Sequence, residues 1–227
     1  MRNAIEIGNG FIVTTDNSGG IGEKPGDMVA APDHVTAYFA ARVALLEQWA
    51  SHAEPVTVMI HNFSGSASWD KYVAGVTDLF EEAGLVVPPI SGSTETNMEL
   101  VQSAVAVTMI GKKKGWSSNA ETRWFIYGTP LVGNEVLERK KEVASLRLLR
   151  EALEDGIVQQ IWPVGSSGVL EEVRHMTDDR LAQVETVLDS TKSAGPATAI
   201  LVAIPIEKIA EAEVHFGALL NKIQIMS

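Results

Sequence analysis

Strand-like and helix-like segments alternate along the whole chain, and this alternation constrains the fold more than any single motif. Short runs of β-branched and aromatic residues predict strands, and longer runs with apolar residues three or four apart predict helices. The expected segments, in chain order, are 4–15, 33–54, 56–60, 69–83, 85–87, 101–110, 124–127, 138–153, 157–163, 169–176, 196–204, 206–216 and 220–225. Such an order predicts α/β or α+β packing, in which helices cover the sheets.

Local signals set the ends of several segments. The run Gly-Asn-Gly at 8–10 predicts a turn, so that 4–15 forms a strand or a hairpin. Asp33 is the expected N-cap of the first helix, and Pro55 is expected to stop that helix. Gly84 marks the end of the second helix, and the polar residues 91–97 are expected to form a loop.

Residues 111–119, in which glycines flank three consecutive lysines, interrupt this order and predict a linker between two domains. The lysine run is most simply a solvated turn. We therefore expect an N-terminal domain over 1–111 and a compact α+β C-terminal domain over 112–227. A chain of 227 residues is long enough to bury two such cores.

The charge and composition exclude several classes of protein. A net charge of −11 argues against a nucleic-acid backbone or an anionic membrane surface as the main partner. With no cysteine, the chain has no disulfides, thiolate metal sites or cysteine nucleophile. No apolar run is long enough to span a bilayer, and residues 1–6 lack the apolar region of a signal peptide. We therefore expect a cytoplasmic protein without membrane or nucleic-acid partners.

The segment 14–27 concentrates the residue types that bind phosphate and metal. It follows the apolar run 11–13 and contains two aspartates, a lysine and three closely spaced glycines: Asp16, Asp27, Lys24, Gly19, Gly20 and Gly22. Glycines let backbone N–H groups approach an anion, carboxylates bind Mg²⁺, and lysine meets phosphate. A polar turn between two strands remains the alternative. The segment matches neither a P-loop nor a Rossmann fingerprint, because Pro25 follows the lysine and no helix begins there.

Two further segments complete a recognisable pattern. The first is the helix that carries Glu47, followed by Ala-Glu-Pro at 53–55, and the second is Gly-Ser-Thr-Glu-Thr-Asn at 92–97. In this order and spacing the chain resembles the aminoimidazole ribonucleotide synthetase (PurM-like) superfamily, which includes thiamine-monophosphate kinase and selenophosphate synthetase. The resemblance covers the N-terminal half and continues more weakly through 165–169 and 194–197.

Within that superfamily the chain is most similar to the α-ribazole kinase group of cobalamin salvage, on residues 17–22, 42–47 and 92–97. The resemblance implies a two-domain α+β PurM-like fold, with a mixed or antiparallel N-terminal sheet that dimerises and a smaller α+β C-terminal domain. The implied activity is transfer of the γ-phosphoryl group of ATP, with Mg²⁺, to the 5′-hydroxyl of a riboside such as α-ribazole. The alternatives are another ATP-dependent enzyme of this superfamily or a non-catalytic nucleotide-binding maturation protein.

The resemblance also implies roles for individual residues. The implied catalytic residues are Asp16, Lys24 and Glu47. The implied nucleotide contacts are Gly19, Gly20, Gly22, Lys24, Arg42, Thr94, Glu95, Thr96 and Asn97. The implied Mg²⁺ ligands are Asp16, Asp27, Asp33, Glu47 and Glu95. Plain structural alternatives remain open for these residues, such as an Asx turn for Asp16 and an exposed loop position for Lys24. The five histidines show no spacing typical of a ligand pair, and His61 is expected to be structural.

Overall fold

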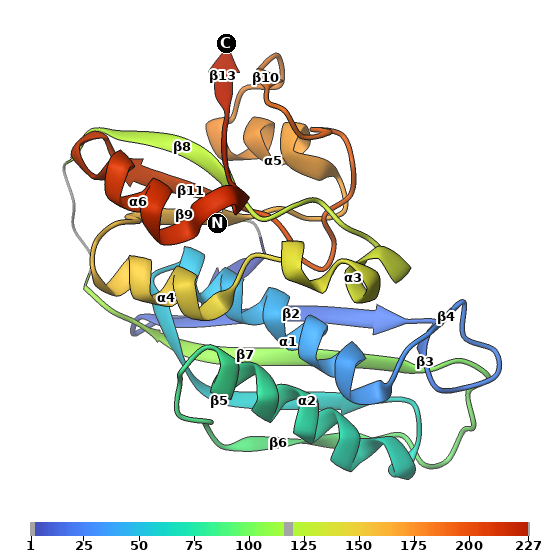
Figure 1. Cartoon of the computed structure of the whole chain (residues 1–227). Helices are drawn as coiled ribbons and strands as arrows, with labels where there is room; N and C mark the ends of the chain where they lie inside the picture. Colours follow the sequence, from blue (N-terminus) through green and yellow to red (C-terminus); the bar gives the residue numbers. More distant parts are fainter. Residues whose placement is uncertain (1–2, 116–119, 227) are drawn as a thin grey trace. The chain divides into compact units, whose positions relative to one another are not determined.

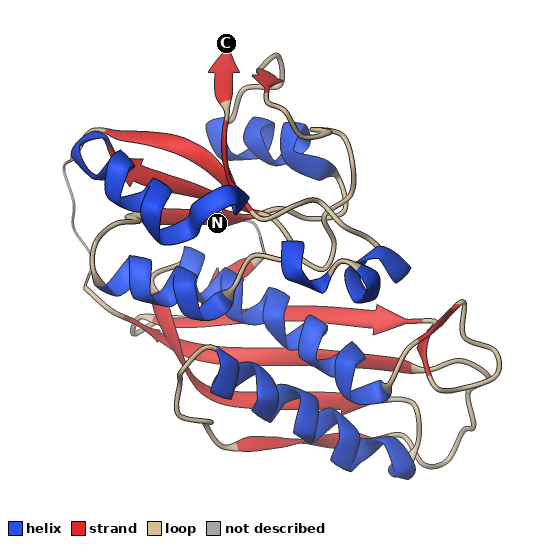
Figure 2. Ribbon diagram, viewed as in Figure 1, coloured by secondary structure: helices blue, strands red, loops and turns tan. Residues whose placement is uncertain are grey.

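The computed structural model describes residues 3–115 and 120–226, and the chain divides into two compact units, 1–115 and 116–227 (Figure 1). Each unit has its own sheets and helices, giving a mixed α+β fold (Figure 2). The end of the predicted linker, residues 116–119, lies outside the described residues. Within the described ranges, no helix is long and apolar enough to cross a membrane.

The first unit is built on a five-stranded mixed sheet of order β1-β2-β7-β5-β6. Its strands are β1 (Ala4–Glu6), β2 (Phe11–Gly19), β5 (Ala53–Asn62), β6 (Ile90–Thr94) and β7 (Ala104–Lys113). All neighbours are antiparallel except β5 and β6, which are parallel. Helices α1 (Asp33–Ala50) and α2 (Trp69–Glu82) lie side by side on one face of this sheet (Figure 1). A short parallel pair, β3 (Ile21–Gly22) and β4 (Val29–Ala30), precedes α1, and the 3-10 turn Ser66–Ser68 precedes α2.

Polar anchors fix α1 on the sheet. The side chain of Gln48 is fully buried, and its Nε2 donates to the carbonyl oxygens of Ile12 and Met109, both at 3.1 Å. The Thr14 hydroxyl donates to the Ala44 carbonyl at 2.8 Å. These bonds tie one helix to two neighbouring strands, because Ile12 and Thr14 belong to β2 and Met109 to β7. They therefore fix the position of the helix on the sheet more strictly than apolar packing does.

The second face of this sheet carries no helix of the first unit. Alternate residues of β7 and β5 are buried on the helix side, while their neighbours Thr108, Met59 and His61 lie on the other face with partial exposure. The Met59 side chain is 38% exposed and that of Ile5 on β1 is 65% exposed. A sheet face of this kind, half-apolar and uncovered within its own unit, is typical of an interaction surface.

The second unit is built on a four-stranded antiparallel sheet of order β12-β8-β11-β9, with a separate pair β10-β13. The strands are β8 (Thr122–Tyr127), β9 (Gln160–Pro163), β10 (Gln183–Glu185), β11 (Ile200–Pro205), β12 (Leu220–Lys222) and β13 (Gln224–Met226). The helices are α3 (Asn134–Glu138), α4 (Leu146–Glu154), α5 (Gly168–Thr177) and α6 (Ile209–Phe216), with 3-10 turns at Lys140–Glu142, Ile206–Lys208 and Gly217–Leu219.

Helices cover both faces of the central strands of this sheet. On one face Tyr127 packs against Phe216 of α6, with ring centroids 4.3 Å apart. On the other face Ile126 shares a buried cluster with Val169 and Val173 of α5. Since neighbouring residues of a strand point to opposite faces, β8 separates the two layers. Every residue of β11 is buried, as expected for a central strand between two helical layers.

Several sequence-based predictions about elements are wrong. The strand expected at 85–87 does not form, and Val86 is 92% exposed. The parallel partner of β5 is instead the polar segment β6, which overlaps the predicted loop. The lysine run is no turn, because β7 continues through Lys113. Asp33 is the first residue of α1 rather than its cap, and Pro55 lies inside β5 after a helix that has already ended at Ala50.

The helix predicted at 138–153 is also interrupted. It is replaced by α3, a 3-10 turn and α4, because Val143 is extended (φ −71°, ψ 135°). Ser145 then caps α4, its hydroxyl accepting the N–H of Leu148 at 3.4 Å. A serine three residues before an apolar helical residue is a start signal, and it overrides the helical periodicity that runs through this region.

Candidate functional site

Two loops far apart in sequence meet at one end of the first sheet. We call residues 20–32 the glycine loop and residues 95–103 the return loop, and the two together the loop pair. The Asp27 carboxylate accepts the Ser103 N–H at 2.7 Å and the Ser103 hydroxyl at 2.8 Å, across 76 positions of sequence. The Gly20 N–H donates to the Ser103 carbonyl at 2.8 Å. Serine 103 is therefore bound on three sides by the glycine loop.

Further contacts join the loop pair along its length. The Lys24 ammonium donates to the Leu100 carbonyl at 2.6 Å, and the Gln102 amide donates to the Gly26 carbonyl at 2.7 Å. Gly26 has no room for a side chain, because a Cβ there would lie 2.5 Å from the carbonyl oxygen of Val101. This glycine is thus required for close approach of the two loops.

Asp27 is the centre of these contacts, and its carboxylate is more acidic than usual. Partial burial disfavours its charge, but hydrogen bonds from Ser103 and from the Lys24 N–H outweigh that cost, so its pKa is lowered. Both carboxylate oxygens already accept hydrogen bonds from within the loop pair. Asp27 was predicted as a Mg²⁺ ligand; its contacts here are those of a residue that holds the two loops together.

The segment predicted as the second half of the site lies at the start of the return loop. Glu95 accepts the N–H groups of Asn97 at 2.6 Å and Met98 at 3.1 Å, and these bonds lower its pKa. The Thr94 hydroxyl accepts from the amide of Asn62 at 3.2 Å. Thr94 ends β6, and the chain continues through the half-buried Glu95 to the exposed Thr96 and Asn97.

Sequence reasoning missed Asn62. Its Nδ2 also donates to the Gly65 carbonyl at 2.8 Å, and its Oδ1 accepts the Ser64 N–H at 2.8 Å. The Ser64 hydroxyl is 2.6 Å from that of Tyr72, whose pKa burial raises to about 12. The position of Asn62 at the end of a strand, with Ser-Gly at 64–65, is the one signal that could have identified this junction.

The start of α1 brings opposite charges together beside the glycine loop. The Asp33 N–H donates to Glu23 at 3.1 Å, and Glu23 forms an ion pair with Lys71 of α2. The hydrogen bond from Lys71 is the main cause of the lowered pKa of Glu23. Asp33 is 2% exposed, and its Oδ1 has no hydrogen-bond partner among the described residues. An unpaired buried carboxylate oxygen is costly, which makes it a candidate for binding a cation.

Other predicted site residues lie away from this end. Glu47 is 14 residues beyond Asp33 on the same helix, about 21 Å away at 1.5 Å per residue. Glu47 is 1% exposed and Arg42 is fully buried. Arg42 lies beside Tyr38, whose pKa is raised chiefly by burial and whose hydroxyl donates to Glu82 at 2.7 Å.

Asp16 occupies the middle of β2 rather than its end. It follows Ile12 and Thr14 on the helix-covered face and is partly buried, opposite Val107 of β7. Gly19 ends β2, and Gly20 has a φ of 71°, a turn conformation that favours glycine. Gly22 packs on Ser103, where a Cβ would lie 2.3 Å from the serine hydroxyl.

The predicted carboxylates are thus divided between two regions. Within residues 3–115 and 120–226, no group of three or more histidine, aspartate or glutamate side chains could hold a metal ion. Asp27 lies in the glycine loop, Asp33 directly follows that loop, and Glu95 begins the return loop, whereas Glu47 lies towards the far end of α1. Mg²⁺ bound with a nucleotide requires only one or two carboxylates, because phosphate oxygens and water supply its other ligands.

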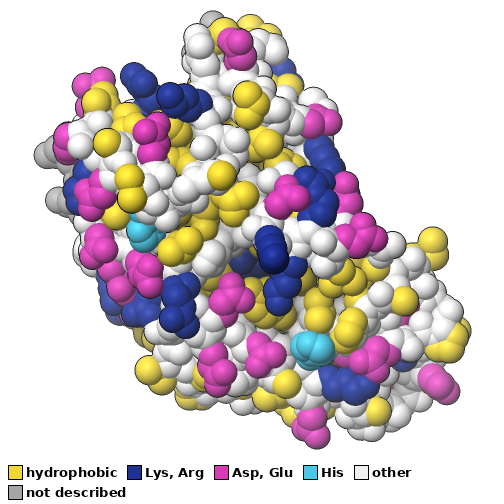
Figure 3. All heavy atoms as spheres, viewed as in Figure 1, with side chains coloured by type: hydrophobic (Ala, Val, Ile, Leu, Met, Phe, Trp, Pro, Cys, Tyr) yellow, Lys and Arg dark blue, Asp and Glu magenta, His cyan; other side chains and the backbone are white. Residues whose placement is uncertain are grey.

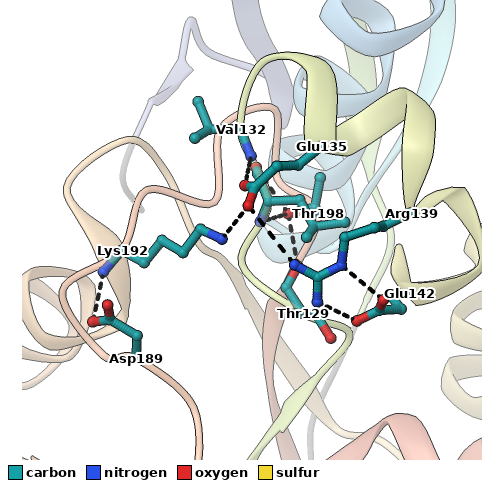
Figure 4. Close-up of polar contacts among 9 residues, drawn as sticks. Thr129, Val132, Glu135, Arg139, Glu142, Asp189, Lys192 and Thr198 are labelled. Atoms are coloured by element: carbon teal, nitrogen blue, oxygen red, sulfur yellow. Dashed lines mark hydrogen bonds and ion pairs between the residues drawn. The ribbon is translucent and has the colours of Figure 1, made fainter.

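The second unit has its own polar network (Figure 4). Glu135 of α3 accepts from Lys192 at 2.8 Å, and Arg139 forms a two-pronged contact with Glu142 at 2.8 and 2.6 Å. The buried Thr198 hydroxyl accepts the Leu131 N–H and donates to the Thr129 carbonyl, both at 2.9 Å. The network fastens residues 129–142 to residues 189–198. The charges on the face shown in Figure 3 are similarly interspersed, without a large basic area.

Comparison with known proteins gives structural relatives alone. No protein-family model matches the sequence, and no curated protein matches it either. Among solved structures, the hydrogenase maturation protein HypE aligns with a TM-score of 0.68 over 98% of this chain and 82% of its own, at 13% identity. A thiamine monophosphate kinase from Aquifex aeolicus aligns with a TM-score of 0.61 over 96% and 86%, at 12% identity.

A third relative, PurL from T. maritima complexed with AMPPCP, aligns with a TM-score of 0.63 at 13% identity. The alignment covers 98% of this chain and only 42% of PurL. These likenesses confirm the two-unit α+β PurM-like fold predicted from the sequence. They do not distinguish the α-ribazole kinase group from other groups with this fold.

Replacing Asp27 by alanine is expected to destabilise the first unit by about 1–3 kcal/mol at neutral pH, because buried N–H and O–H donors lose their acceptor. The lowered pKa means that the charged form stabilises the folded state. This contribution is present above the ordinary pKa of 3.8 and is lost as the pH falls through the lower folded value. The difference between wild type and variant should therefore shrink on acidification, as measured by urea unfolding over a pH series.

Glu99→Ala is the matched control, since Glu99 is exposed in the same return loop. It should change the free energy of unfolding by less than about 0.5 kcal/mol. A loss for Asp27→Ala that is equally small, or that stays constant down to pH 3, would contradict the role given to this carboxylate.

Proposed function

We propose that the chain is an ATP-binding protein and that the loop pair forms the phosphate end of its nucleotide site. The observation that carries the proposal is the contact between the glycine loop and the return loop. Both loops contain residues that the sequence analysis assigned to the nucleotide. Solved structures with this fold include one with AMPPCP and a HypE in complex with ATP. The glycines and Lys24 of the loop pair have the chemistry that polyphosphate requires.

The Mg²⁺ that accompanies ATP would be held by Asp33 and Asp16, with Glu95 as a further candidate. Among the described residues, Asp33 has a buried carboxylate oxygen that lacks a hydrogen bond, and its negative charge favours a cation. Mg²⁺ supplies neutralisation of the phosphate charge when bound. The residues of the chain orient the phosphates: glycine N–H groups by close approach, and Lys24 by its charge.

The reaction that we propose is phosphorylation of a riboside, with α-ribazole as the first acceptor to test. The 5′-hydroxyl oxygen forms a bond to the γ-phosphorus, the bond from that phosphorus to the ADP oxygen breaks, and the hydroxyl proton passes to water. This step requires positioning and charge stabilisation more than covalent chemistry from the protein. The sequence resemblance to α-ribazole kinases supports the acceptor, and the kinase among the structural relatives supports the reaction class.

A non-catalytic nucleotide-binding role is the second candidate. The burial of Arg42 and Glu47 favours this role, because Arg42 was expected to contact the nucleotide and Glu47 to be catalytic. One structural relative with this fold, HypE, is a maturation protein and forms a complex with HypF. The two candidates share ATP binding and differ in turnover.

Turnover separates them. Purified protein should release ADP from Mg-ATP with α-ribazole, and much more slowly with thiamine phosphate, formylglycinamidine ribotide or no acceptor, measured by a coupled ADP assay. ADP release with another acceptor alone would move the proposal to that reaction. Binding of AMPPCP without ADP release on any acceptor would favour the maturation role.

Asp16→Asn should remove the metal dependence of nucleotide binding. In wild type, calorimetry with AMPPCP should show at least tenfold tighter binding with Mg²⁺ than with EDTA, and this ratio should fall towards one in the variant. Asp78→Asn is the control, because Asp78 is an exposed carboxylate on α2. An Asp16→Asn protein that folds normally and keeps both the ratio and full turnover would exclude Asp16 as a Mg²⁺ ligand.

We further propose that the uncovered face of the first sheet pairs with a second copy of the chain. Met59→Glu should then convert a dimer to a monomer in analytical ultracentrifugation without lowering thermal stability at low protein concentration, because the new charge lies on an exposed face. Asp78→Lys, on the helix side, should leave the dimer intact. A wild-type protein that is monomeric at high micromolar concentration would contradict this proposal.

A further inference from the structure

In the second unit, the strand β8 has a partly open edge. The register pairs β11 with all six residues of β8, but β12 pairs only with Phe125–Tyr127. After Lys222 the chain leaves this sheet and continues as β13, which pairs with β10 (Figure 1). Residues Thr122–Trp124 therefore lack a ladder partner on that side among the described residues.

The backbone groups of Thr122 point to this open edge. The Glu121 carbonyl accepts the Ile206 N–H at 3.1 Å, so residue 121 faces β11. Backbone groups alternate in direction along a strand, so even-numbered residues face the opposite side. The Gly128 N–H, which donates to Leu219 at 3.0 Å on the β12 side, agrees with this alternation. The N–H and carbonyl of Thr122 are thus directed to where a further strand would lie.

The side chains beside the open edge differ between the two faces of the sheet. Arg123 shares the α6 face with Tyr127, and Lys222 lies on that face because it is opposite Phe125. Trp124 shares the α5 face with Ile126 and packs against its buried cluster. A pocket of about 850 Å³ opens here, lined by Thr122, Arg123, Trp124, Phe125, Glu185, Thr186, Val187, Ile209, Lys222, Ile223, Gln224 and Ile225.

The charges of this pocket oppose the net charge of the chain. Arg123 forms no ion pair with any described residue, and the Lys222 side chain is 84% exposed with its nearest carboxylate, Glu213, at 4.0 Å. Glu185 is the one acidic residue in the described lining. The lining is therefore net positive in a protein of net charge −11, which favours an acidic ligand.

We propose that the open edge of β8 binds an extended acidic segment of a partner protein by strand addition. Backbone hydrogen bonds to Thr122 and its neighbours would supply affinity, and alternate side chains would supply specificity. The partner's acidic residues would lie on the α6 face beside Arg123 and Lys222, and its apolar residues on the α5 face beside Trp124. The expected ligand thus alternates acidic and apolar residues over about 10 Å, three residues of strand. This proposal is independent of ATP binding.

The test uses two fluorescein-labelled pentapeptides, Val-Glu-Val-Glu-Val and Val-Lys-Val-Lys-Val, and fluorescence polarisation with the full chain. The acidic peptide should bind at least tenfold more tightly than the basic one. Thr122→Pro should weaken binding of the acidic peptide at least tenfold, because it removes an N–H at the open edge. The β11 ladder does not use this N–H, since Thr122 lies opposite Pro205. No binding of the acidic peptide at millimolar protein, or equal binding by Thr122→Pro, would overturn the proposal.

A charge reversal tests the acidic preference of the open edge even if Thr122→Pro fails to fold. The double variant Arg123→Glu, Lys222→Glu should prefer the basic peptide, whereas Lys140→Glu, at an exposed lysine of the same unit, should keep the wild-type preference. Thermal unfolding confirms that each variant is folded. An unchanged preference in the double variant would overturn the proposed placement of the acidic residues.

Discussion

The hydrogen bonds between Asp27 and Ser103 determine the form of the candidate site. One carboxylate accepts both the backbone and the side-chain donor of a residue 76 positions away, and it also accepts the N–H of Lys24. Without the Asp27 carboxylate, fewer hydrogen bonds would hold the two exposed loops in one arrangement. The remaining contacts between the loops are also mainly polar. The glycines then serve the packing of the two loops as much as any ligand.

This arrangement gives a nucleotide site two kinds of residue with different roles. Asp27 and Glu95 hold backbone N–H groups in place, and both have lowered pKa values because they accept those hydrogen bonds. Asp33, by contrast, is buried with an oxygen that lacks a partner in the described part of the chain. A site for a charged ligand needs both kinds of residue. Loops that are already fixed lose less conformational entropy on binding, and an unpaired polar group becomes satisfied by the ligand.

Periodicity in the sequence was enough to predict α1, α2, the first hairpin and the α+β fold. Prediction from periodicity failed where an apolar segment is not a strand and a polar segment is. Apolar Val86 suggested a strand, yet β6 is polar and includes Gly92, where a Cβ would lie 1.9 Å from the Ile60 carbonyl. The resemblance implied a nucleotide contact for Arg42 and a catalytic role for Glu47, yet both residues are buried in α1. Burial of a polar helix residue depends on tertiary neighbours, which a single sequence does not contain.

The contact between the two segments of the candidate site was not predicted from the sequence, because Ser103 and Asn62 match no ligand-binding motif. Hydrogen–deuterium exchange with and without AMPPCP and Mg²⁺ is the most direct test of a nucleotide site at the loop pair. With AMPPCP and Mg²⁺ bound, the amides of 19–28 and 94–103 should exchange more slowly, and the second-unit segment 120–127 should change little. Protection confined to other segments, or no protection at saturating nucleotide, would contradict a nucleotide site at the loop pair.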